Sequence, residues 1–174
     1  SKQIHQERIR EHHEILGGST SRATQAAKNL NLNPQEISEI YVFFEEKDAI
    51  EKNFYCLETL ETPDTLISVQ APNFVVIIKD ETEYWFDGLN CGYGGEGPSG
   101  TENILDYWGI LEKSKDNFMN FIKSTSILHI INDNNNWTFY KEKSHYLSND
   151  ELYDRIKIHL YSFNKKLVLT QENT

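Results

Sequence analysis

The sequence predicts an α+β fold in which an antiparallel sheet of about five to six strands packs against helices. Apolar residues recur at helical spacing near the N-terminus and in the last quarter of the chain. The middle instead holds short runs rich in Val, Ile, Tyr, Trp and Phe, which favour strands. With 174 residues, of which 38% are hydrophobic, the chain has the usual size and composition of one domain. We therefore expect a single domain over 1–174, with a helical segment at 1–52 and an α+β core at 53–174.

Three helices are expected before residue 52, at 3–16, 21–30 and 34–46. The pair Gly17-Gly18 would end the first helix. The third has Asn33 as its N-cap and Pro34 at its first position. Its apolar residues fall on one face: Ile37, Ile40, Tyr41 and Phe44.

The rest of the chain alternates strands and helices. Strands are predicted at 65–70, 73–79 and 83–87, joined as a meander, and a hairpin at 126–131 and 137–143. Helices are predicted at 101–111, at 117–124 and from Ser148 onward, where Glu151 completes a capping box. A last short strand is predicted at 167–169.

Helices at 21–30 and 34–46, joined by a short turn, would have the spacing of a helix-turn-helix. A DNA-reading second helix offers Arg, Lys, Asn or Gln to base edges. This helix instead offers four glutamates: Glu36, Glu39, Glu45 and Glu46. Two helices packed on the sheet are therefore the favoured interpretation.

The charge distribution excludes some classes of partner. The net charge is −10, and two acidic blocks, 34–64 and 80–106, lie between nearly neutral ends. Nucleic acid requires the opposite sign over its contact surface, so nucleic-acid binding is disfavoured. A basic protein or a cationic ligand is electrostatically easier to bind. The sequence has no apolar run long enough to span a membrane and no signal-peptide pattern, so we expect a cytoplasmic protein whose two cysteines are reduced.

A glycine-rich loop spans 88–100 and contains six of the nine glycines. It follows a predicted strand and precedes a predicted helix, an arrangement that can bind phosphates through free backbone amides. No Lys or Arg occurs between 80 and 106, so the carboxylates there would sooner bind ribose hydroxyls or base N–H groups. The predicted ligand-binding residues are Asn90, Gly92, Tyr93, Gly94, Gly95, Glu96, Gly97, Ser99, Gly100 and Thr101.

Cys91 lies inside this loop and offers a different chemistry. Local amides could lower the pKa of its thiol and make it a nucleophile, with His145 as base and Asp87 as a third member. Asp87-Gly88 just before Asn90-Cys91, with His145 downstream, resembles the ovarian-tumour-type cysteine proteases over these few residues. That family has its cysteine at a helix start, whereas nine residues separate Cys91 from the helix predicted here.

Three functional hypotheses follow. The leading one is a non-enzymatic binding domain that holds a polar small molecule, such as a nucleotide derivative, at the glycine-rich loop and the adjacent helix N-terminus. The second is an acidic inhibitor or immunity-type protein that covers a basic protein partner. The third is a cysteine hydrolase. No resident cofactor or metal site is predicted, because His5 and His12, the best-placed candidate ligands, are two helical turns apart.

Overall fold

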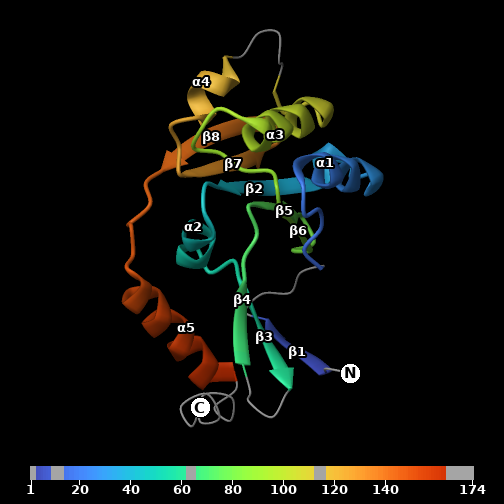
Figure 1. Cartoon of the computed structure of the whole chain (residues 1–174). Helices are drawn as coiled ribbons and strands as arrows, with labels where there is room; N and C mark the ends of the chain where they lie inside the picture. The colour runs from blue at the N-terminus through green and yellow to red at the C-terminus, as the bar shows by residue number, and fades with distance from the viewer. Residues whose placement is uncertain (1–2, 9–13, 62–65, 112–116, 164–174) are drawn as a thin grey trace.

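The computed structural model describes residues 3–8, 14–61, 66–111 and 117–163, and it has two antiparallel sheets flanked by helices (Figure 1). The larger sheet has the strand order β6-β5-β2-β7-β8, and the smaller has the order β1-β3-β4. The strands are β1 Gln3–Arg8, β2 Ile37–Phe43, β3 Cys56–Glu61, β4 Leu66–Gln70, β5 Phe74–Ile78, β6 Glu83–Phe86, β7 Ile127–Asp133 and β8 Asn136–Glu142. The helices are α1 Thr20–Asn29, α2 Glu46–Glu51, α3 Glu96–Tyr107, α4 Phe118–Ile122 and α5 Asn149–Phe163. The predicted α+β class is confirmed.

Strand β2 forms the centre of the five-stranded sheet. Tyr41 lies opposite Val75 of β5 on one side and His129 of β7 on the other. Because side chains alternate along a strand, Ile40 and Val42 face one side of the sheet and Tyr41 faces the other. Both sides are covered, so the strand is rich in Ile, Val, Tyr and Phe throughout.

Two hydrophobic cores therefore lie on opposite faces of this sheet. Helices α1, α3 and α4 cover the first face, and α2, α5 and the three-stranded sheet lie on the second (Figure 1). The first core includes Ala23, Ala27, Ile40, Val42, Phe74, Leu89, Ile104, Leu105 and Leu128. The second includes Phe43, Ile50, Phe54, Tyr55, Val75, Trp85, Ile127 and Leu152.

The two edges of the five-stranded sheet differ. At the β6 edge, Leu16 forms a parallel bridge with Phe86, and its amide donates to the carbonyl of Trp85 at 2.9 Å. The other edge is β8, which pairs with β7 over its full length. The segment leading into α1 therefore covers one edge, so the N-terminal part of the chain contributes to both sheets.

Two predictions for the N-terminal region are wrong. Residues 3–8 of the predicted first helix form strand β1, and the rest of the predicted 34–46 helix after Glu36 is mostly strand β2. Asn33 does act as an N-cap, since its side chain accepts from Gln35 N, but it caps a single 3-10 turn, Pro34–Glu36. With a strand where the second helix was expected, the helix-turn-helix is excluded. The 1–52 segment is thus not helical throughout.

Most later elements are confirmed, with three corrections. Strand β4 pairs with β3 and not with β5, so the predicted three-strand meander is wrong. The helix expected at 101–111 begins at Glu96, and β3 and α2 were not predicted. The Ser148–Glu151 capping box is confirmed by two reciprocal hydrogen bonds of 3.2 Å. The strand predicted at 167–169 lies outside the described residues.

Helices α1 and α3 approach each other closely through small residues. Gly100 of α3 lies against Thr20 of α1, and a Cβ atom added to Gly100 would also stand 2.9 Å from Leu89 Cδ2. A Cβ atom added to Gly97 would likewise overlap the side chain of Asn90. Thr20 of α1 also donates its hydroxyl to the carbonyl of Gly88 at 2.8 Å, which joins α1 to the loop that precedes α3. Part of the glycine cluster therefore serves close packing of helices.

Among the described residues, no helix is both long and apolar enough to cross a membrane.

We expect Gly100→Ala to destabilise the protein by about 1–3 kcal/mol, the usual penalty for overpacking a tight contact. Gly94→Ala is the matched control, because a Cβ atom there would meet nothing within 4 Å. Denaturant unfolding of both variants tests this. Equal stability of the two would contradict the role assigned to the α1–α3 contact.

Candidate functional site

The glycine-rich segment is largely helical at its C-terminal end. Gly95 is the N-cap of α3, and residues 96–100 form the first turns of that helix. In the first turn Pro98 has no amide hydrogen, and Ser99 N donates to the carbonyl of Gly95 at 3.0 Å. Only the amides of Glu96 and Gly97 are left to meet a ligand there. The helix predicted at 101–111 therefore begins earlier, inside the glycine-rich segment.

The predicted ligand-binding residues do not converge on one hollow. An open depression of about 680 Å³ between α1 and α3 is lined by Gly95, Glu96, Ser99 and Gly100 of the predicted set. Its remaining walls come from Thr20, Ser21, Thr24, Gln25 and Asn103. Other members of the set lie elsewhere: Thr101 is buried and donates to the carbonyl of Asn90, and the ring of Tyr93 contacts that of Phe44. Ligand binding by this segment stays a prediction.

Cys91 is fully buried, with its sulfur 3.7 Å from the carbonyl oxygen of Val42 and 3.6 Å from that of Ser126. Burial, with a smaller contribution from the Asp48 carboxylate, raises the pKa of the Cys91 thiol well above its usual range. A nucleophilic cysteine needs the opposite environment. His145 meanwhile contacts Glu51, so the geometry gives no support to a Cys91–His145 pair.

Both cysteines should resist alkylation in the folded protein. Cys91 is 0% exposed and Cys56 is 1% exposed, so a thiol reagent reaches them only when the chain opens. We expect reaction with iodoacetamide to be at least about 100-fold slower in native buffer than in denaturant. Rapid labelling of Cys91 in native protein, detected by mass spectrometry, would restore the hydrolase hypothesis.

An acidic and aromatic surface surrounds the start of α2. We call it the α2 acidic face, and its members are Phe44, Glu45, Glu46, Asp48, Glu51, Asp87, Tyr93 and Tyr146. Strand β2 ends at Phe43, so the chain turns there and presents Phe44, Glu45 and Glu46 to solvent. Lys47 is the one basic residue within this run of the chain. Asp48 and Glu51 lie on α2, and the other members come from the β6–α3 loop and from the segment that follows β8.

Two carboxylates of this face titrate abnormally. Burial raises the pKa of Asp48, and the neighbouring Glu45 and Glu51 add to the effect, although hydrogen bonds from Ser144 and the Glu45 amide oppose it. Burial also raises the pKa of Asp87, with a further contribution from Glu46. Burial of these carboxylates, with a smaller contribution from neighbouring like charges, therefore opposes folding when they are ionised.

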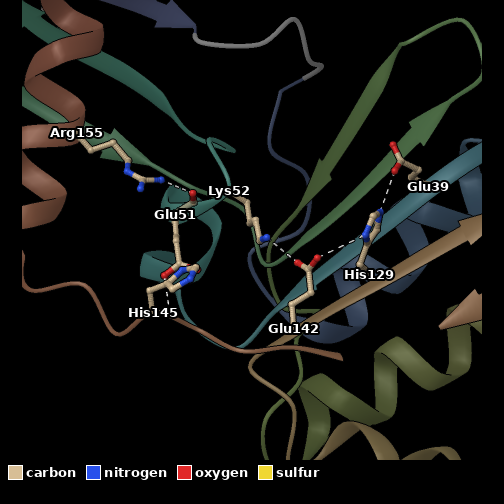
Figure 2. A network of polar contacts seen from close by, with 7 residues as sticks. All are labelled: Glu39, Glu51, Lys52, His129, Glu142, His145 and Arg155. Atoms are coloured by element: carbon tan, nitrogen blue, oxygen red, sulfur yellow. Dashed lines mark hydrogen bonds and ion pairs between the residues drawn. The ribbon is translucent and has the colours of Figure 1, made fainter. Parts of the chain in front are cut away.

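Polar contacts bind the end of α2 to its surroundings (Figure 2). Lys52 Nζ lies 2.8 Å from Glu142 Oε2, and His129 Nδ1 lies 3.9 Å from the other oxygen of Glu142. His129 Nε2 is 2.9 Å from Glu39 Oε1, and the imidazole stacks on Tyr41 with ring centroids 4.0 Å apart. This chain of contacts joins α2 to strands β2, β7 and β8.

A second group of contacts joins α2 to the C-terminal part of the structure. Glu51 Oε1 accepts from the amide of His145 at 2.7 Å, and Glu51 Oε2 lies 3.1 Å from His145 Nδ1. The guanidinium of Arg155 on α5 donates to the backbone carbonyl of Glu51. Glu51 is therefore the meeting point of α2, the segment after β8, and α5.

The chain matches no protein-family model, and comparison with curated proteins and with solved structures finds no similar protein. The residues themselves must carry any functional argument. Within the described part of the chain, no three His, Cys, Asp or Glu side chains are grouped so that they could hold a metal ion.

Sequence reasoning located the acidic blocks but did not bring the α2 acidic face together. It placed Glu45 and Glu46 on a long helix, Tyr93 in the ligand-binding set and Asp87 in the cysteine hydrolase hypothesis. The missed signal was the change after Phe44, where the apolar run 40–44 gives way to Glu45-Glu46. A strand ending there places these glutamates beside the β6–α3 loop.

Asp87→Asn should stabilise the protein at neutral pH by about 0.5 kcal/mol, on the scale of a partly exposed charge contact. The pKa of Asp87 is raised in the folded state, so its contribution to stability is present in acid and is lost as the pH rises through the folded pKa. Denaturant unfolding at pH 3 and pH 7 measures this. The difference between variant and wild type should be larger at pH 7; a destabilised variant at pH 7 would contradict it.

Proposed function

We propose that this chain is a non-enzymatic binding protein that covers a basic surface of a protein partner with its α2 acidic face. The observation that carries the proposal is the gathering of carboxylates at this face, where burial raises the pKa of Asp48 and of Asp87 and neighbouring glutamates add to the effect. Such crowding opposes folding and is relieved when a cationic surface approaches. A sequence selected for stability alone would space these charges apart.

The exposed aromatic rings fit the same function. Phe44 is 38% exposed, Tyr93 is 40% exposed and Tyr146 is 81% exposed. The rings of Phe44 and Tyr93 contact each other, with centroids 6.2 Å apart, and Phe44 and Tyr146 line the same hollow. Aromatic side chains are enriched where proteins bind each other, and they attract arginine and lysine through their ring faces. Carboxylates would guide the partner, and the rings would supply the contact area.

The glycine-rich loop gives weaker support to the small-molecule hypothesis. Two of its glycines are explained by packing, at the contacts of Gly97 with Asn90 and of Gly100 with Thr20. The hollow beside it is open and contains Glu96, which would repel a phosphate. For these reasons we favour the acidic-inhibitor hypothesis, which was the second of the three that the sequence suggests.

Titration with a hexa-arginine peptide, followed by NMR, tests the proposal. We expect the NMR chemical shifts of Glu45, Glu46 and Asp87 to change. The affinity should fall steeply as salt is added, because the attraction is between exposed charges. The triple variant Glu45→Gln, Glu46→Gln, Asp87→Asn should lose at least about tenfold in affinity, since each neutralised contact contributes several tenths of a kcal/mol or more.

A second triple variant controls for net charge. Glu36→Gln, Asp80→Asn and Glu81→Gln remove the same charge from exposed residues at the β5–β6 turn and the neighbouring 3-10 helix. This control should retain affinity within about twofold of wild type. Equal losses in the two triple variants would show attraction to the whole acidic chain and would refute a specific face.

A further inference from the structure

The segment 143–148, between β8 and α5, crosses the buried acidic side of α2. Its backbone amide at His145 donates to Glu51 Oε1, and the imidazole of His145 lies on Glu51 Oε2 (Figure 2). The Ser144 side chain hydrogen-bonds to the carboxylate of Asp48. Asp48 and Glu51 are only 4% and 8% exposed, so this segment helps to cover both carboxylates.

Polar contacts hold the segment in place far more than apolar burial does. The side chain of His145 is 75% exposed, and Tyr146 is 81% exposed. Leu147 is half-buried and packs at the margin of the second core. Tyr146 has a φ of +51°, a left-handed conformation that is unfavourable for a residue with a bulky side chain. A segment with few buried apolar contacts opens locally at a small fraction of the free energy of global unfolding.

A hollow lies beneath the segment. Its volume is about 300 Å³, and Ser144, Tyr146 and Leu147 form one wall. Across from them lie residues of α2 and of the segment that precedes it, together with the residue before β7: Phe44, Glu45, Lys47, Asp48, Glu51 and Ser126. The hollow therefore has carboxylates on one side and the crossing segment on the other.

We propose that segment 143–148 is a strap that lifts to admit an arginine or lysine side chain of the partner to Asp48 and Glu51. The inference rests on the proposed function, because it concerns how the α2 acidic face is opened. In the closed form His145 occupies the position beside Glu51 that the incoming cation takes. Arg155 donates to the backbone carbonyl of the same residue, so α5 stays fastened to α2 beside the point that the strap covers.

The groups around the hollow favour replacement of the His145 imidazole by a cation of the partner. Lys47 lines it and is exposed, which leaves it able to turn toward solvent. His145 carries a charge only when protonated, whereas arginine is always charged and can bind a carboxylate through two nitrogens. A partner arginine thus offers Glu51 a stronger contact than the imidazole it displaces.

Hydrogen exchange measured by NMR tests whether the strap opens. The His145 amide should exchange at least tenfold faster than the Phe43 amide, which donates to Asn73 O in the buried part of β2, after each rate is corrected for its intrinsic value. Low denaturant should leave the His145 rate unchanged, since local opening exposes little surface. His145→Ala keeps the amide but removes the imidazole, so exchange at position 145 should rise at least threefold while Phe43 is unchanged.

The hexa-arginine peptide then tests what opening does. His145→Ala should bind the peptide with an association rate at least twofold above wild type, because less of the strap must be displaced. Exchange at position 145 with the rate and denaturant dependence of Phe43 would overturn the strap. Faster exchange in His145→Ala with unchanged association would overturn its role as a gate while leaving the proposed function intact. Failure of the peptide to bind wild type and variant alike would overturn both.

Discussion

The structure depends on the burial of β2 on both of its faces. Ile40 and Val42 pack under the helices α1 and α3, while Tyr41 and Phe43 pack toward α2 and the second sheet. Two cores are thus built on one strand, which pairs with β5 on one side and with β7 on the other. Because β2 is fixed so firmly, the residues that follow it leave the sheet in one defined direction. The α2 acidic face is the consequence, since Phe44 and Glu45 stand directly at that exit.

Stabilising contacts and unfavourable burial act on the same residues at this exit. Asp48 supports α2 by accepting the amide of Glu45 at 3.1 Å, and yet burial raises the pKa of its own carboxyl. Glu51 similarly anchors His145 and Arg155 while lying almost completely out of water. Natural proteins keep such destabilising arrangements at binding sites, where the interaction with a partner offsets the lost stability. The same two residues therefore hold neighbouring segments together in the free protein and contact the partner in the proposed complex.

The sequence predicted elements well where one structure satisfied every local signal, as in α1, β5 and the β7–β8 hairpin. It failed at 37–43 because Ile37, Ile40, Tyr41 and Phe44 suit a helical stripe as well as a strand buried on both faces, and only tertiary pairing decides between them. It failed at 96–100 because Gly97 and Gly100 disfavour an isolated helix but allow close contacts, of Gly97 with Asn90 and of Gly100 with Thr20 of α1. The α2 acidic face was missed because it depends on tertiary structure: Asp87 comes near Glu46 only when β2 and β6 lie in one sheet.

The way the N-terminal part of the chain serves both sheets has a kinetic consequence. Strand β1 pairs with β3 across a sequence separation of roughly 50 residues, whereas β5 and β6 pair within a short turn. Closing a long loop has a greater entropic cost and slows the step that requires it. The large sheet can therefore begin to assemble from its β5–β6 hairpin while β1 is still unpaired. The smaller sheet can likewise begin from its β3–β4 hairpin, and within the large sheet β2 and β7 pair across roughly 90 residues, so each sheet starts from a local hairpin and is completed by a long closure.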